Sequence, residues 1–448
     1  MPDLLAPTLV RSVTERLEAA GHDTWAVGGA VRDALLGHGG SDWDLATAAR
    51  PEEVRRIFRR TVPLGVEHGT VGVLGPSGDM LEVTTFRRDV ETTGRHAVVR
   101  FADRIEDDLS RRDFTINAIA WHPIRHELLD PFAGQRDLRS GVLRTVGEAR
   151  ERFAEDYLRI LRAVRFAGRF ALAIAPRTWE ALVAARASVD NLSAERVREE
   201  LTKILAHRRP SAALSLLAAS GVMRHVAPPL ADLVDLETEL GPVTTPWSET
   251  LLAVDHLRPE RGGLRLAALL ARVGMPEART RDLRGGWRFT GHERAGARLA
   301  RELLGRLRYS NADIDRVGDL VALQEDLFPP DSDGARVRRW LSRVRPERVA
   351  DLFRLRSARV RAAVVRSGGA PPAEDLIERW RMARAVLRDR PALSISDLAI
   401  DGSDLIELGL TPGPEFSLIL RELLEVVLDE PRANDRERLL GLVRERRP

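Results

Sequence analysis

The 448-residue sequence contains no cysteine. This absence excludes a disulfide framework, a zinc or iron–sulfur site held by cysteine, and a cysteine nucleophile. Lysine is nearly absent as well, since Lys203 is the single lysine among 70 basic side chains. Arginine suits phosphate and base edges better than lysine, but so complete a replacement is more typical of a codon-composition habit than of a function.

No stretch approaches the roughly 18 uncharged apolar residues of a transmembrane helix. Met1 to Val10 lacks the basic start and apolar run of a signal peptide. The net charge of +3, from 70 basic and 67 acidic side chains, excludes a polybasic chain and an acidic disordered tail. We therefore expect a soluble cytoplasmic protein without a membrane partner.

The apolar pattern changes along the chain. Up to about residue 145, short β-type runs alternate with helical patterns, whereas beyond Glu148 apolar residues recur at helical spacing and we expect no strand. The predicted strands are Thr24–Val27, Trp43–Thr47, Gly69–Leu74 and Met80–Phe86, and helices are predicted at Leu9–Ala20 and Pro51–Arg59. This order predicts an α+β fold, with a sheet-and-helix head followed by an all-α region. Breaks in the helical region are predicted at His207–Pro210, Pro329–Gly334 and Arg366–Pro372.

Asp42 and Asp44 lie two residues apart in the segment SDWDLAT. On a strand, this spacing puts both carboxylates on one face. Two carboxylates beside a glycine-rich turn suit a hard divalent cation such as Mg²⁺. A surface strand with two solvated acids is the alternative, and the pair alone does not decide between them.

The upstream segment VGGAVRD has the pattern of a strand, a glycine pair and the start of a helix. Gly28 and Gly29 would let the backbone approach a phosphate, to which the helix start would present its free N–H groups. Arg32 could pair with the phosphate through two hydrogen bonds. An ordinary strand–helix turn is the alternative, but the aspartate pair that follows favours the phosphate site.

Two further segments carry candidate polar residues. In MLEVTTF, alternation puts Glu82 opposite the face of Leu81 and Val83, so Glu82 is a third carboxylate if this strand lies beside the aspartate strand. An exposed edge glutamate is the alternative. In RRDFTINA, Arg112 would meet nucleotide phosphate or base, unless the segment is only a charged helix start with Asp113 as its cap.

A polar ridge is predicted in EDYLRILRAVRF, where four charged residues are spaced three apart. They are Asp156, Arg159, Arg162 and Arg165. A solvated face with internal salt bridges is the alternative. Against that alternative, three of the four charges are positive, so the ridge compensates itself poorly.

The motifs GGAVRD, DWD, EVTTF, RRDFTINA and EDYLRILRAVRF, in this order and spacing, resemble the bacterial class II tRNA nucleotidyltransferase family, which comprises CCA-adding enzymes and related poly(A) polymerases. The resemblance covers about residues 20–210 and returns in the C-terminal segments LAIDG, LG and PGP. It implies a polymerase-β-like nucleotidyltransferase head at 1–145, a helical neck at 146–210, a helical body at 211–366 and a tRNA-binding helical tail at 373–448.

The resemblance also implies a reaction and a site. CTP and ATP would supply C and A residues to the tRNA 3′ acceptor end by two-metal nucleotidyl transfer with Mg²⁺. Asp42 and Asp44 would bind the metal, and Glu82 would be a further catalytic carboxylate. The nucleotide-binding residues would be Gly28, Gly29, Arg32, Arg112, Asp113, Asn117, Asp156, Arg159, Arg162 and Arg165.

The selection of bases can be argued chemically. Cytosine and adenine present an amino donor beside a ring-nitrogen acceptor, whereas guanine and uracil present a carbonyl and an N–H. Asp156 only accepts and Arg159 only donates, so the pair could match C and A and leave unpaired polar groups against G and U. Our hypothesis is that these two side chains replace a nucleic acid template.

A second resemblance lies in the body. LRLAALLARVGMP and the GHE at 291–293 resemble parts of the metal site of HD-domain phosphohydrolases. Ala271 and Arg272 replace the His-Asp pair of that site, and Met275 replaces its usual lysine. Because an arginine would repel a metal ion, we expect a degenerate HD-like domain without phosphohydrolase activity.

Several functions stay open at this point. CC-adding, A-adding and poly(A)-adding relatives share these motifs, and the segment RRDVETTGRHAVVR, which corresponds to the family's flexible loop, departs from the family pattern at Ala97. A non-catalytic RNA-binding protein would not need both aspartates, and an aminoglycoside-type nucleotidyltransferase would not need the long helical region. The sequence does not decide between a monomer and a homodimer.

Overall fold

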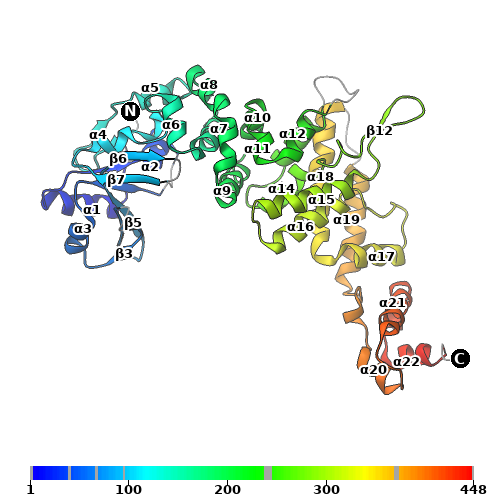
Figure 1. The fold of residues 1–448 in the computed structure, drawn as a ribbon. Coiled ribbons are helices and arrows are strands. Elements are labelled where there is room, and N and C mark those ends of the chain that lie inside the picture. The colour runs from blue at the N-terminus through cyan, green and yellow to red at the C-terminus, as the bar shows by residue number, and fades with distance from the viewer. Residues whose placement is uncertain are drawn as a thin grey trace. The chain divides into compact units, whose positions relative to one another are not determined.

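The computed structural model describes residues 4–38, 42–65, 69–93, 96–236, 245–367 and 373–445. The chain divides into two compact units, Met1–Pro228 and Pro229–Pro448. Their elements can be followed from blue to red in Figure 1. Within the described residues, no helix is both long enough and apolar enough to cross a membrane.

The first unit is built on a seven-stranded mixed sheet. In sheet order its strands are β3 (Thr61–Pro63), β4 (Thr70–Leu74), β5 (Met80–Thr85), β2 (Asp44–Thr47), β1 (Thr24–Val27), β8 (Ala120–Trp121) and β9 (Leu128–Leu129). Only β2 and β5 run parallel, and the other neighbours are antiparallel. The start of β2 therefore lies beside the end of β1.

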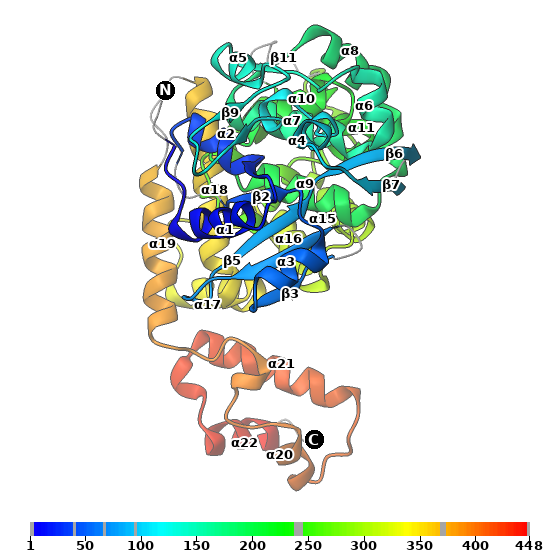
Figure 2. The same ribbon diagram turned by 90° about the vertical axis from the view of Figure 1, so that its left-hand side faces the viewer.

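The residues of the central strand β1 are buried on both faces of the sheet, because helices cover both faces. Helices α1 (Thr8–Ala19) and α3 (Pro51–Ile57) contact the strands of one face, as Figure 2 also shows. Trp25 and Val27 point to the other face, where they share an apolar cluster with Ile105 and Leu109 of α4 (Ile105–Ser110). Helix α2 (Gly29–Leu35) follows β1 directly.

The structure confirms the predicted strands and helices of the head with shifts of at most two residues at their ends. The sequence missed the short sheet strands β3, β8 and β9. It also missed the antiparallel hairpin of β6 (Arg87–Thr93) and β7 (His96–Phe101), which falls in the predicted flexible loop. Gly94 and Arg95 of that loop lie outside the described residues.

The rest of the first unit is mainly helical. Its helices are α5 (Gly134–Arg139), α6 (Ala149–Glu155), α7 (Leu158–Phe170), α8 (Pro176–Ala184), α9 (Ala194–Leu205), α10 (Ser211–Ala219) and α11 (Met223–Val226). The predicted break at His207–Pro210 is confirmed, since it separates α9 from α10. The prediction that no strand follows Glu148 is wrong, because β11 (Ala173–Ile174) pairs with β10 (Val142–Leu143). A two-residue strand is too short to give an alternating sequence pattern.

Helices also dominate the second unit. They are α12 (Pro228–Val234), which begins at the unit boundary, α13 (Pro246–Asp255), α14 (Gly262–Leu270), α15 (His292–Arg306), α16 (Asn311–Leu323), α17 (Gly334–Val344), α18 (Pro346–Ser367), α19 (Ala373–Arg388), α20 (Gly402–Glu407), α21 (Pro414–Asp429) and α22 (Arg436–Glu445). Strands β12 (Thr280–Arg281) and β13 (Trp287–Arg288) are a second exception to the all-α prediction. The predicted loop at Pro329–Gly334 separates α16 from α17, and residues 368–372 of the predicted linker lie outside the described residues.

The C-terminal helices have an apolar core of their own, in which α20, α21 and α22 take part (Figure 2). Its most buried members are Leu405, Leu423, Val427, Ala433 and Leu439. The α+β class is thus confirmed, with a mixed-sheet head followed by mostly helical structure.

Candidate active site

Three carboxylates meet at the start of β2. Asp44 is in register with Glu82 on the parallel strand β5 and with Val27 on the antiparallel strand β1. Glu82 is exposed while Leu81 is buried, as the alternation predicts. Asp42 precedes the strand, so the prediction that both aspartates lie on it is wrong for Asp42.

The charges at this sheet position repel one another. Burial, then the negative charges of Glu82 and Asp42, raise the pKa of Asp44 to about 6, while Arg112 opposes the shift. A divalent cation would relieve this repulsion, and carboxylate oxygens are the ligands that Mg²⁺ prefers. The donor set therefore fits such an ion, with Asp42 and Asp44 as the predicted ligands.

Gly28 lets an arginine approach the carboxylates. Its φ is +75° and its ψ is −132°, a combination that side chains disfavour. A Cβ at Gly28 would also lie 2.9 Å from Nη1 of Arg112. Arg112 is held by the carboxylate of Asp108 at 3.0 Å and by the carbonyl oxygen of Asn117 at 3.4 Å. The turn therefore leaves room for the Arg112 guanidinium, whose positive charge acts on Asp44.

Arg32 is buried beneath the same turn. It donates from Nε and Nη2 to Asp33 at 2.8 and 2.6 Å, and from Nη1 to the side chain of Asn117. Its guanidinium also stacks over Phe170 at 4.5 Å. Burial lowers the pKa of Arg32, but a guanidinium stays protonated in proteins. Asp33 accepts a further hydrogen bond, at 3.2 Å, from Arg169 of α7.

The first residue of the predicted polar ridge does not lie on the same helix as the other three. Helix α7 starts at Leu158, so Asp156 lies in the break that follows α6 and not on the helix. One oxygen of Asp156 accepts from the Leu158 N–H at 3.0 Å, and the other accepts from Arg196 of α9 at 2.7 Å. Arg159 is on the first turn of α7 and donates to the Arg111 carbonyl oxygen at 3.0 Å and to Glu155.

Acids from other elements neutralise the rest of the ridge. Arg162 donates to Asp113 at 2.7 Å, and Arg165 donates to Glu200 of α9 at 2.6 Å. Asp113 also accepts from the side-chain amide of Asn117 at 2.8 Å. Burial opposes ionisation of Asp113, but Arg162 and these hydrogen bonds outweigh it, so its pKa is lowered. The sequence argument of poor self-compensation missed these partners because they are remote in the chain.

The predicted residues line one open hollow of about 640 Å³. Its lining consists of Gly28, Gly29, Arg32, Asp44, Arg87, Arg111, Arg112, Asp113, Asn117, Asp156, Leu158, Arg159, Arg162, Arg165, Phe166, Arg169 and Arg196. Of the residues predicted for the site, only Asp42 and Glu82 are missing from this lining.

Four arginines in the lining had no predicted role: Arg87, Arg111, Arg169 and Arg196. The spacing of Arg169, four residues after Arg165, could have placed it on the same helix face. Arg87 and Arg196 come from a hairpin strand and from another helix, and carry no such signal. The hollow thus gathers nine arginines and three aspartates, which suits a polyanionic ligand.

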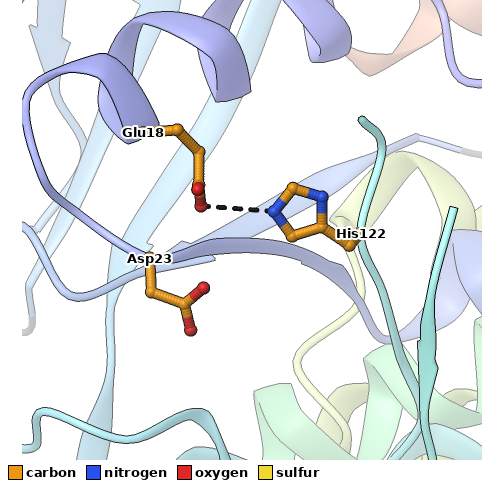
Figure 3. A group of neighbouring side chains, drawn as sticks. All are labelled: Glu18, Asp23 and His122. Carbon is orange, nitrogen blue, oxygen red and sulfur yellow. Dashed lines mark hydrogen bonds and ion pairs between the residues drawn. The ribbon is translucent and has the colours of Figure 1, made fainter. Parts of the chain in front are cut away.

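A second group of possible metal ligands comprises Glu18, Asp23 and His122 (Figure 3). Nδ1 of His122 accepts from the Arg125 N–H at 3.0 Å, so Nε2 carries the proton and donates to Glu18 at 3.2 Å. The Arg125 guanidinium pairs with Glu18 at 3.3 Å and with Asp23 at 3.2 Å. Because an arginine already occupies the place of a cation, this group is a structural network. Asp23 adjoins the start of β1, at the other end of the strand from Asp44.

In the HD-like segment, the side chain of Arg272 is a positive charge at a position where HD-domain phosphohydrolases carry a metal ligand. Arg272 forms an ion pair with the buried Glu249, and the carbonyl oxygen of Ala271 accepts from Gln324. The predicted lack of phosphohydrolase activity stays a prediction.

Comparisons with known proteins agree with this geometry. Residues 24–144 match the family model "Poly A polymerase head domain", and residues 171–233 match "Probable RNA and SrmB- binding site of polymerase A". The chain is 34% identical over 440 residues to the CCA-adding enzyme of Geobacillus stearothermophilus, covering 97% of this chain and 96% of the relative. It is 32% identical over 438 residues to the CCA-adding enzyme of Lactiplantibacillus plantarum, covering 97% and 95%.

Solved structures show the same fold. The structure of the Bacillus stearothermophilus CCA-adding enzyme in complex with CTP matches with a TM-score of 0.72 and 30% identity, covering 99% of this chain and 98% of that one. The Thermotoga maritima enzyme complexed with tRNA matches with a TM-score of 0.56 and 21% identity, covering 98% and 94%, which supports the fold alone. The similarity spans almost the whole length of each chain, and the protein therefore belongs to the bacterial CCA-adding family of nucleotidyltransferases.

Proposed function

We propose that this enzyme adds C and A residues from CTP and ATP to the 3′ end of tRNA without a nucleic acid template. The observation that carries the proposal is the carboxylate group at Asp44. Its pKa of about 6 reflects burial and then repulsion from Glu82 and Asp42, beside a hollow lined by arginines. Carboxylates for a metal next to cations for a triphosphate are the parts that nucleotidyl transfer needs.

The proposed reaction joins the RNA 3′-oxygen to the α-phosphorus of the nucleotide and releases pyrophosphate. Asp42 and Asp44 would hold one Mg²⁺, which would lower the pKa of the 3′-hydroxyl, and a second Mg²⁺ on the triphosphate would stabilise the leaving pyrophosphate. Glu82 would add negative charge beside these ligands. Arg32 and Arg112, with the backbone at Gly28 and Gly29, would hold the triphosphate.

Asp156 and Arg159 are the proposed base-reading pair. Each is held by a partner that restricts its movement, Asp156 by Arg196 and Arg159 by the Arg111 carbonyl oxygen. A fixed acceptor and a fixed donor fit the edges of C and A and leave buried groups unpaired against G and U. Arg162 and Arg165 would support this pair by holding α7 against Asp113 and Glu200.

One experiment tests the proposed activity. Transcripts of a tRNA that end before CCA, after C and after CC are each incubated with one radiolabelled nucleoside triphosphate and Mg²⁺. We expect CMP on the first two substrates and AMP on the third. Asp42→Asn should reduce all three incorporations by at least about 100-fold, because one anionic metal ligand is lost. Incorporation by Asp42→Asn at the wild-type rate would refute the metal role.

The same assay separates the partial activities. A CC-adding enzyme would stop after CC, an A-adding enzyme would act only on the CC-ended transcript, and a poly(A) polymerase would add many A residues. Poly(A) addition is included among these outcomes because the head matches a poly(A) polymerase family model. We also propose that the chain is divided into a head, a neck, a body and a tail at the boundaries expected from the sequence, and that the enzyme is cytoplasmic.

A further inference from the structure

The second unit carries a short arginine-rich hairpin, residues 279–288. Strands β12 and β13 pair antiparallel, with Thr280 opposite Arg288 and Arg281 opposite Trp287. Figure 1 shows this segment as a loop that projects from the neighbouring helices near the label β12. It lies outside the residues that match the RNA-binding family model, 171–233.

Asp282 is the only acid in this hairpin, and its carboxylate accepts hydrogen bonds from the backbone of the hairpin turn. It accepts from the N–H groups of Arg284 and Gly286, both at 2.9 Å, and these hydrogen bonds lower its pKa. Its side chain makes one ion pair, with Nε of Arg288 at 3.4 Å. A single constrained carboxylate therefore faces four arginines.

The other three arginines make no ion pair among the described residues. They are Arg279, Arg281 and Arg284. The guanidinium carbons of Arg279 and Arg281 lie 3.5 and 4.1 Å from the ring centroid of Trp287. Contact with the indole orders these guanidiniums without neutralising them. Nη1 of Arg281 also donates to the carbonyl oxygen of Gly285 at 3.2 Å, which orders this side chain further. An ordered guanidinium that no acid neutralises is suited to bind phosphate oxygens.

This local surplus contrasts with the chain as a whole, whose 70 basic and 67 acidic side chains nearly balance. Three arginines on helices α15 and α17 of the same unit are neutralised by acids. Arg298 pairs with Glu277 and Glu302, Arg301 pairs with Asp319, and Arg343 pairs with Asp326. The hairpin is thus a local positive surface that complements a polyanion.

We propose that the hairpin 279–288 binds backbone phosphates of the RNA substrate through Arg281, Arg284 and Arg288. The nature of that RNA rests on the proposed function, whereas the charge complementarity does not. A guanidinium can donate two hydrogen bonds to a phosphate or to a carboxylate. RNA is favoured over an acidic peptide because its phosphates are regularly spaced along the backbone, so that several arginines of one hairpin can each meet one. Each contact should release counterions, so it should contribute to the salt dependence of RNA binding.

The test compares two triple variants of the full-length enzyme. Arg281→Gln/Arg284→Gln/Arg288→Gln removes the hairpin charge, and the matched control Arg298→Gln/Arg301→Gln/Arg343→Gln removes three paired charges from helices α15 and α17. Fluorescence anisotropy measures binding of a labelled tRNA transcript without CCA between low and high salt. For the hairpin variant, we expect roughly tenfold weaker binding and a slope of log K against log salt that is shallower by about 2. The control should keep the wild-type slope.

Leu283→Ser tests the hairpin without changing its charge, and its slope should stay that of the wild type. Equal slopes for the wild type and the hairpin variant would overturn the proposal, as would an equal loss in both triple variants. Loss of binding to poly-glutamate with unchanged tRNA binding would assign the surface to an acidic protein and also overturn it. Failure of the proposed function is distinguishable, because it would appear as absent CMP and AMP incorporation in the wild type.

Discussion

Asp44 and Glu82 stand side by side in register on the two parallel strands of the sheet. Two acids one strand apart repel each other, and a third at Asp42 adds to the repulsion. The molecule therefore maintains an electrostatically unfavourable site at the end of β1. Such a cost is expected where charge is needed for binding or catalysis.

Removing this charge should stabilise the metal-free protein. We expect Asp44→Asn to raise the free energy of unfolding by about 1–3 kcal/mol at pH 7.5 in EDTA, while it abolishes nucleotide incorporation. Because the pKa of Asp44 rises from 3.8 to about 6 on folding, the wild type loses stability as the pH rises through 6. The difference should therefore shrink as the pH falls from about 6 to about 4, and it should be absent below pH 4. Urea denaturation measures it, and Asp331→Asn, at an exposed loop position, should change nothing at either pH.

Protons should compete with the metal at the same group. At pH 5, one unit below the pKa of Asp44, binding of Mn²⁺ should be roughly tenfold weaker than at pH 7.5. Electron paramagnetic resonance of free Mn²⁺ measures this directly, without nucleotide or RNA. A metal affinity that stays constant between pH 5 and 7.5 would show that Asp44 is not a ligand.

Gly28→Ala should move Arg112 away from the carboxylates, because the new Cβ would lie 2.9 Å from its Nη1. We expect kcat/KM for CTP to fall at least about tenfold, with a stability loss of about 1–3 kcal/mol from backbone strain. Gly37→Ala is the matched control, since Gly37 also has a positive φ of 73° but a Cβ there would meet no atom within 4 Å. Equal activity of the two variants would show that the position of Arg112 beside Gly28 does not affect catalysis.

Arg196→Gln should impair selection of the base. It removes the 2.7 Å partner of Asp156, so the acceptor of the base-reading pair is no longer fixed. We expect the ratio of CTP to UTP incorporation to fall about tenfold or more, measured as kcat/KM for each nucleotide. Glu199→Gln, an exposed position on the same helix, is the control. An unchanged ratio would mean that Asp156 is positioned without Arg196.

Arg165 should act mainly on stability. It forms a buried ion pair with Glu200, which Lys203 also approaches at 3.3 Å. We expect Arg165→Met to cost about 2–3 kcal/mol, and Arg165→Met/Glu200→Leu to cost less than the two single variants together. A stable Arg165→Met enzyme with lost nucleotide selectivity would instead support direct contact with the nucleotide.

The sequence predicted the head well where its patterns are local. The strand of Thr24–Val27, the glycine turn and the alternation around Glu82 each follow from neighbouring residues. The sequence predicted that Glu82 lies beside Asp44 only on the condition that their strands are neighbours. The order of strands depends on the whole sheet and does not follow from local patterns.

Partners distant in the chain could not be predicted in this way. Asp156, in the break before α7, contacts Arg196 of α9, 40 residues later, and Arg165 of α7 contacts Glu200 of α9, 35 residues later. The start of α7 was also misplaced, since Asp156 accepts from the Leu158 N–H and so ends one helix before the next begins. Residue spacing predicts a helix face, but a side chain that bonds to the backbone can interrupt it.

The contact between Arg162 and Asp113 closes a circuit of hydrogen bonds. It runs from α7 into the head and back to α7 through Arg162, Asp113, Asn117, Arg32, Asp33 and Arg169. The helix that carries the proposed base-reading residue Arg159 and the turn proposed to hold the phosphates are thus parts of one hydrogen-bond network. With the proposed roles, a base that displaced α7 would also weaken the binding of its own triphosphate, and base recognition would be coupled to reaction within a single substrate.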